Sequence, residues 1–222
     1  MKVTVGVPAG RDAFSCEWVY AWTYTLIAAA ARKCELVPMM VAGSSSISGA
    51  RTRLAHASRE KGHDAIFFID DDVTWKPDDF LNVLAGLDRF DVCAGSYSHR
   101  ATSSVRHMVI NPGPSDKDGY RSADRVPGGF MAIRGQFLSR MLDAYKGITT
   151  QWQMETFSNP FAEFEETADG YKFLSDDYAF CDRVKEQGGT IGFWPKCQLK
   201  HETKTAMDMP YEEWERRLAE ES

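Results

Sequence analysis

Predicted strands and helices alternate through the first hundred residues of this 222-residue chain. Four short runs rich in β-branched and other apolar residues, each followed by turn residues, are predicted as strands. They are Lys2–Val7, Leu36–Val41, Ala65–Ile69 and Val92–Tyr97. The segments between them carry apolar residues at helical spacing. This βαβαβαβ order predicts an α/β fold with a mostly parallel sheet and helices on both faces.

Turn residues and polar or charged side chains follow each of these strands. The four segments are Pro8–Arg11, Gly43–Ser46, Asp70–Asp72 and Tyr97–Arg100. Since the carboxyl ends of parallel strands meet at one edge of a sheet, we expect these segments to converge. A binding or active site is predicted at that edge.

Three helices are predicted among the strands. The first contains the apolar run Trp18–Ala31, which is expected to be a buried helix because it is shorter than the roughly 18 residues that cross a bilayer. The second is expected to be capped by Ser48. The third begins at Pro77, with acidic residues in its first turn, and ends near Gly86.

Beyond residue 100 this regular order breaks down. The elements expected there are a strand at 130–133, a helix at 136–145, irregular chain at 147–170, a helix at 176–187, strands at 191–194 and 198–200, and a final charged helix opened by Pro210. With no linker or internal repeat, residues 1–222 are expected to form one domain.

The composition argues against several classes of protein. The net charge of −6 gives no general attraction to nucleic acid or an anionic membrane, although residues 98–140 carry seven Lys/Arg against three Asp/Glu. The five cysteines include no CxxC pair, which excludes zinc-finger spacing, and we expect them to be reduced. The first residues lack the apolar core of a signal peptide, so a cytoplasmic location is expected, within the host if a phage encodes the chain.

The triplet Asp70-Asp71-Asp72 follows the apolar strand Ile66–Ile69. In extended chain Asp70 and Asp72 would share one side, and two such carboxylates repel each other unless a cation lies between them. Mg²⁺ or Mn²⁺ carrying a diphosphate meets that requirement. A solvated acidic turn is the alternative.

The triplet and three later segments together resemble a known family. They are IFFIDDDV at 66–73, Gly128-Gly129-Phe130, Ser175–Cys181 and Leu199-Lys200-His201. In this order they resemble the motifs of GT-A glycosyltransferases, especially the small family 2-like members of bacteria and phages. Asp176 stands where that family usually has Glu.

The resemblance implies roles for these residues. Asp70 would approach the nucleotide's ribose, and Asp72 and His201 would ligate the metal, Mn²⁺ or Mg²⁺. Asp71 is grouped with the nucleotide contacts but is expected to point away. Gly128 and Gly129 would belong to the segment beside the bound donor and acceptor.

The resemblance also implies catalytic residues. Asp177 would be the general base of an inverting transfer, and Asp176 would orient the acceptor or the base. Ser175 followed by two acids is equally a good helix start. The remaining expected donor contacts are Pro8, Ala9, Arg11 and Arg51. The family often has Ala-Arg-Asn at Arg51, whereas this chain has Ala-Arg-Thr, which weakens the nucleotide contact.

The resemblance therefore implies a metal-dependent transferase that moves a sugar from a nucleotide-diphosphate donor, most simply a UDP-sugar, to an acceptor hydroxyl. Residues 1–100 would bind the donor, 101–205 the acceptor, and 206–222 would form a terminal helix. No integral membrane association is expected. The basic stretch 98–140 suggests an anionic acceptor, such as a hydroxylated base in phage DNA. A sugar nucleotidyltransferase and a non-catalytic nucleotide- or metal-binding module remain alternatives.

Overall fold

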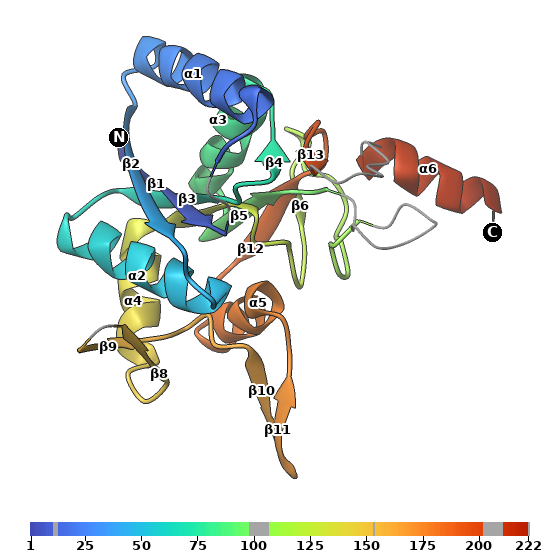
Figure 1. Ribbon diagram of the computed structural model, residues 1–222. Coiled ribbons are helices and arrows are strands. Elements are labelled where there is room, and N and C mark those ends of the chain that lie inside the picture. Colours follow the sequence, from blue (N-terminus) through green and yellow to red (C-terminus); the bar gives the residue numbers. More distant parts are fainter. Residues whose placement is uncertain (11–12, 98–106, 153, 202–210, 222) are drawn as a thin grey trace.

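The computed structural model describes residues 1–10, 13–97, 107–152, 154–201 and 211–221. Figure 1 shows the arrangement of its elements. In chain order they are β1 (Lys2–Ala9), α1 (Cys16–Ala31), β2 (Glu35–Ala42), α2 (Ile47–Glu60), β3 (Ala65–Ile69), β4 (Val73–Thr74), α3 (Pro77–Ala85), the 3₁₀ helix η1 (Gly86–Asp88), β5 (Val92–Gly95), β6 (Arg121–Ser122), β7 (Phe130–Arg134), α4 (Gly135–Ala144), β8 (Thr149–Trp152), β9 (Glu155–Ser158), β10 (Phe164–Thr167), β11 (Gly170–Phe173), α5 (Asp176–Glu186), β12 (Ile191–Trp194), β13 (Lys200–His201) and α6 (Tyr211–Glu221).

A seven-stranded sheet in the order β2-β1-β3-β7-β5-β12-β6 forms the centre of the molecule. β1 runs parallel to β2 and β3, and β12 runs parallel to β5. β7 lies antiparallel between β3 and β5, and β6 is antiparallel to β12. The predicted mostly parallel sheet is confirmed, with one antiparallel strand inserted at its middle.

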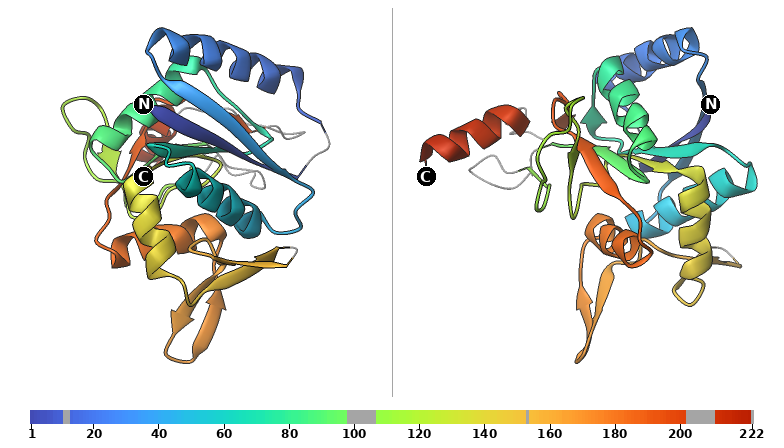
Figure 2. Two further views of the ribbon diagram at one scale, coloured as in Figure 1. Left: turned by 90° about the vertical axis from the view of Figure 1, so that its left-hand side faces the viewer. Right: turned by 180° about the vertical axis from the view of Figure 1, so that it is seen from behind.

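Helices cover both faces of the sheet, as predicted. In Figures 1 and 2, α1 and α3 lie on one face, and α2, α4 and α5 lie on the other. β3 shows why: Phe67 and Ile69 belong to the core under α1 and α3, whereas Ile66 and Phe68 belong to the opposite core. Successive strand residues point to opposite faces, so a strand buried on both sides must be apolar throughout.

Two local predictions are wrong. Residues 147–170, predicted to be irregular, contain the hairpin β8–β9 and most of the hairpin β10–β11. These strands are only four residues long and largely exposed, and even the alternating aromatic residues of β11, Tyr171 and Phe173, are not buried. Helix α2 is capped by Ser46, whose Oγ accepts a hydrogen bond from the Gly49 N–H at 3.1 Å, and not by Ser48.

Helix α1 also differs from expectation. It was predicted to be buried, but only Trp18, Ala21, Thr25 and Ala29 are buried, all on the face toward the sheet. Its outer face is exposed and apolar, with Tyr20 as one example.

All five cysteines are free thiols, and Cys16 is exposed while three are buried. In the part of the chain that the structure describes, no helix is both long and apolar enough to cross a bilayer.

Candidate active site

The segments that follow β1, β2 and β3 meet around a cavity of about 210 Å³, so three of the four segments predicted to converge do so. Of the fourth, Tyr97–Arg100, residues 98–100 lie outside the described residues. The lining residues are Pro8, Ala9, Gly10, Ser44, Ser46, Ile47, Ala50, Asp70, Asp71 and Asp72. Of the expected donor contacts, Pro8 and Ala9 therefore lie at the cavity. Arg11 lies outside the described residues.

The acidic triplet forms a turn, not an extended strand end. The Val73 N–H donates to the Asp70 carbonyl at 3.2 Å, and the Asp70 N–H donates to the Gly129 carbonyl at 2.9 Å. Asp71 Oδ2 accepts the Gly10 N–H at 2.7 Å. The expectation that Asp71 points away was wrong, because side-chain alternation holds for strands and fails in a turn.

The turn brings Asp72 to His201. Strand β13 pairs antiparallel with β4, placing His201 opposite Val73. His201 Nε2 lies 3.3 Å from Asp72 Oδ1, and both side chains are largely buried. The ring of Tyr97 packs edge-on against the His201 imidazole, with centroids 5.1 Å apart.

These two side chains fit a divalent cation that also binds a diphosphate. Mg²⁺ is commonly held by one or two carboxylates, substrate phosphate oxygens and water, without a complete protein cage. An added imidazole nitrogen is a ligand that Mn²⁺ accepts more readily. Among the described residues, no group of three or more His, Cys, Asp or Glu side chains is arranged to hold a metal. A cation here would need ligands from the donor.

Arg51 joins the triplet to the later acidic pair. Its side chain is only 2% exposed; Nη2 donates to Asp70 Oδ1 at 2.9 Å and Nη1 donates to Asp176 Oδ2. Burial alone would lower the pKa of Arg51, but Asp176, Asp70 and Asp177 raise it above its ordinary value. Arg51 therefore remains a cation between carboxylates.

Asp176 is a carboxyl of the site with a raised pKa. Burial raises its pKa to about 6, with the neighbouring Asp177 and Asp70 acting in the same direction and Arg51 opposing them. The group thus titrates in the range where enzymes tune acid–base residues.

Asp177 is held by its neighbours near the Gly128-Gly129 segment. Oδ1 accepts the Ser175 hydroxyl at 2.6 Å, and Oδ2 accepts the Gly128 N–H at 3.2 Å. A Cβ on Gly128 would lie 2.8 Å from Arg51 Nη1. Glycine is required there because the backbone passes so close to the guanidinium.

Tyr97 is a site residue that was expected only as part of the converging segment Tyr97–Arg100, with no role of its own. Its hydroxyl accepts the Gly129 N–H at 3.0 Å. Burial raises its pKa well above the ordinary value, with Asp70 and Asp177 adding to the effect, so the hydroxyl stays protonated. Trp18 is a second addition, since its indole N–H reaches the Asp70 carbonyl at 3.4 Å.

The predicted residues therefore gather into one network, but not all of them line the cavity. Asp176, Asp177, Gly128 and Gly129 are absent from its described wall and connect to it through Arg51, Tyr97 and Asp70.

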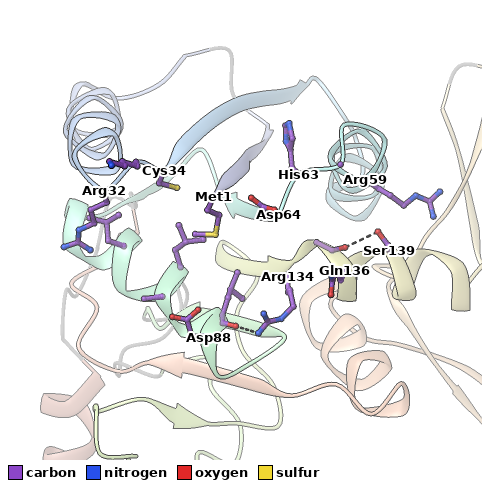
Figure 3. A pocket seen from close by; sticks show the side chains of 17 residues that line it. Met1, Arg32, Cys34, Arg59, His63, Asp64, Asp88, Arg134, Gln136 and Ser139 are labelled. Atoms are coloured by element: carbon purple, nitrogen blue, oxygen red, sulfur yellow. Dashed lines mark hydrogen bonds between the residues drawn. The ribbon is translucent and has the colours of Figure 1, made fainter.

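A larger pocket of about 670 Å³ lies at the opposite edge of the sheet (Figure 3). Met1, Cys34 and Asp64 line it near the starts of β1, β2 and β3, and Arg134 lines it at the end of the antiparallel β7. Its described wall contains none of the predicted site residues. The arginine side chains are partly committed elsewhere, since Arg59 pairs with Asp143 and Arg134 donates to the Phe90 carbonyl.

No protein-family model matches this chain, and no curated protein sequence matches it closely. Solved structures do match. A197 from STIV aligns with a TM-score of 0.59 at 15% identity, covering 96% of this chain and 92% of that one. S. aureus TarS 1–349 aligns at 0.48 with 11% identity over 87% and 58%, and GalNAc-T7 with UDP, GalNAc and Mn²⁺ at 0.46 with 10% identity over 90% and 43%.

The alignment with A197 shows a shared fold. The predicted α/β architecture, with a mostly parallel central sheet covered by helices on both faces, is confirmed. At 15% identity this likeness extends to the fold alone, because one fold supports many different chemistries.

Proposed function

We propose that this chain is a metal-dependent glycosyltransferase that moves a sugar from a nucleotide-diphosphate donor to an acceptor hydroxyl. The observation that carries the proposal is the meeting of Asp72 and His201, 129 residues apart in sequence, with 3.3 Å between Oδ1 and Nε2. Both residues belong to motifs that resemble those of GT-A enzymes. If these motifs resembled the family only by chance, the first, with Asp72, and the last, with His201, would not be expected to lie side by side in space.

The charge of the site supports the same proposal. Asp70, Asp176 and Asp177 surround the guanidinium of Arg51, and Asp71 and Asp72 lie beside Asp70 on the cavity wall. Carboxylates this dense favour a bound cation, because each additional negative charge raises the cost of ionising the others. A divalent ion between Asp72 and a diphosphate would relieve that repulsion.

In the proposed complex, Asp72 and His201 hold the cation, Mn²⁺ or Mg²⁺. When bound, the metal neutralises charge that develops on the leaving diphosphate. The cavity of about 210 Å³ is smaller than the roughly 300–1,000 Å³ of pockets that bury whole ligands, so it suits part of a donor such as the nucleoside. Asp70, 17% exposed at the cavity wall, can still accept a ribose hydroxyl there.

Asp177 is the proposed general base of an inverting transfer. Ser175 and Gly128 fix its carboxylate, while Arg51 fixes Asp176 beside it. A base so oriented can take the acceptor hydroxyl's proton as the sugar–diphosphate bond breaks. Since neither Asp lines the described cavity, the acceptor would meet the sugar beyond the nucleoside.

The acceptor is proposed to be a hydroxyl on an anionic polymer, such as modified DNA, on the basis of the basic stretch 98–140. The structure gives this part of the proposal no added support. Arg121 pairs with Glu215 and Arg125 pairs with Asp182, which neutralises part of the local positive charge. Of the five other basic residues of this stretch, Arg100 and Arg106 lie outside the described residues.

Donor hydrolysis tests the reaction without knowledge of the acceptor. The protein is incubated with UDP-, GDP-, CDP- and TDP-sugars, with and without Mn²⁺, and release of the nucleoside diphosphate is measured. We expect Mn²⁺-dependent release from one donor, and a loss of at least about 10–100-fold in Asp72→Asn and His201→Ala, as in metal sites that lose a supporting residue.

Asp78→Asn, at an exposed carboxylate of α3 outside the site, is the matched control and should keep the wild-type rate. Equal rates for Asp72→Asn and wild type would refute the assignment. Pyrophosphate release from a sugar 1-phosphate and a nucleoside triphosphate would instead identify a nucleotidyltransferase. Nucleotide binding without turnover of any substrate would identify a binding module.

A further inference from the structure

The outer face of α1 is unlike the solvent face of an ordinary surface helix. From Trp18 to Ala31 the helix contains no charged residue. Surface helices normally carry charged and polar residues on the side away from the core. Here that side exposes large apolar side chains: Val19 (50%), Tyr20 (65%), Tyr24 (57%), Leu26 (37%) and Ile27 (63%).

This apolar face continues onto the edge of the sheet. β2 is the terminal strand, and Met40 on it is 51% exposed. Between α1 and β2 lies an apolar hollow of about 160 Å³, lined by Val5, Val7, Trp18, Trp22, Pro38, Met39 and Met40. In Figure 1, α1 and β2 lie at one end of the molecule, away from β12 and α6.

The spacing of the exposed residues is that of a helix-packing seam. Cys16, Tyr20, Thr23, Ile27 and Ala30 follow one another at intervals of four, three, four and three residues, and all are exposed. Repeats of this kind align side chains along one stripe of a helix, where they pack against another helix. A partner that binds this face is therefore expected to contribute a helix with an apolar stripe of its own.

We propose that α1 packs against α1 of a second copy of this chain across a two-fold axis. Such an interface uses the same patch twice and must be complementary to itself. A face without charges satisfies this condition, because no like charges meet. With a dyad near Thr23 and antiparallel helices, Tyr20 of one copy lies beside Ile27 of the other.

The exposed area suits a dimer. The five apolar side chains of α1 and Met40 expose on the order of 600 Å², the upper end for the largest patch of a typical monomer. Neighbouring Thr23, Ala30 and Ala31 bring the face close to the roughly 800 Å² that each partner contributes to a standard interface. A membrane fits less well, since interfacial helices carry Lys and Arg on their polar face and the chain has a net charge of −6.

Sedimentation equilibrium of the full chain across about 1–100 μM tests the proposal. We expect wild type to reach twice the mass of one chain. The double variant Tyr20→Glu/Ile27→Glu places four like charges in the seam and should weaken dimerisation by at least about 100-fold. Both positions are exposed, so circular dichroism and the Tm should stay near wild type.

Tyr171→Glu/Phe173→Glu is the matched control, because these side chains of β11 are 73% and 76% exposed and lie far from α1 in the chain. This variant should dimerise as wild type does. Tyr20→Ser, which adds no charge, should weaken the dimer by a smaller factor and keeps the test usable if the double variant does not fold.

A wild-type protein that stays monomeric throughout this range overturns the proposal, and so does a dimer that the seam variants leave intact. If a monomeric wild type floats with anionic lipid vesicles and the double variant does not, the face belongs to a membrane contact instead.

Discussion

Arg51 donates to carboxylates that come from two distant parts of the chain. Asp70 follows it by 19 residues and Asp176 by 125. Arg51 was expected to contact the donor, but its two terminal nitrogens are both engaged within the protein. A local pattern identifies a candidate residue, whereas its partner depends on long-range folding. Tyr97 was placed in a converging segment, but its contact with Gly129 was missed for the same reason.

The raised pKa of Asp176 makes a stability prediction. Its pKa is about 6 when folded and about 4 in an unfolded chain, so between these values the folded state binds more protons. The stabilisation is present below pH 4 and is lost as pH rises through 6. Compared with Asp176→Asn, wild type should lose on the order of 3 kcal/mol across this window. Urea unfolding at half-unit intervals from pH 3 to 7 measures the difference.

Asp143→Asn is a control for which stability is expected to change with pH in the opposite direction. A hydrogen bond from Lys146 lowers the pKa of Asp143, so its contribution is present above the ordinary pKa and is lost as pH falls. The wild-type advantage over that variant should grow as pH rises from 3. If the free energy of unfolding of wild type, relative to Asp176→Asn, stays constant or grows from pH 4 to 6, the pKa of Asp176 is not raised.

At the scale of single elements, the sequence predicted most helices and strands of the central sheet because their signals are local. Pro77 and the acidic first turn of α3 are such signals. The hairpins of residues 149–173 were missed because strands of four residues that stay largely exposed are too short to carry a clear apolar pattern. The acidic triplet was assigned to the correct strand end, but its turn depends on a hydrogen bond from the Asp70 N–H to the carbonyl of Gly129, a residue that lies outside the local sequence.

The N-terminus of α2 offers a test at this scale. Ser46 caps the helix and lines the candidate nucleotide cavity. Ser46→Ala removes the acceptor for the Gly49 N–H and should lower the free energy of unfolding by about 1 kcal/mol. Ser46→Asn should restore most of it. Thermal and urea unfolding measure both, with exposed Ser45→Ala as the neutral neighbour. A Ser46→Ala variant as stable as Ser45→Ala would contradict the cap.

At the scale of the whole molecule, topology assembles the site. β7 inserts antiparallel between β3 and β5, which carries Gly129 to the triplet, and β13 returns to β4, which carries His201 to Asp72. Neither arrangement has a local signature in the sequence. The resemblance to GT-A motifs predicted that these residues act together, and the strand order supplies the physical reason why they meet.

Crystals soaked with UDP and MnCl₂ test this account most directly, because manganese is located by its anomalous scattering. The account predicts one strong manganese peak within coordination distance of Asp72 and His201, with the UDP diphosphate completing the coordination and the nucleoside in the cavity beside Pro8 and Ser46. Manganese and diphosphate bound at another place, with Asp72 and His201 still paired only with each other, would contradict it.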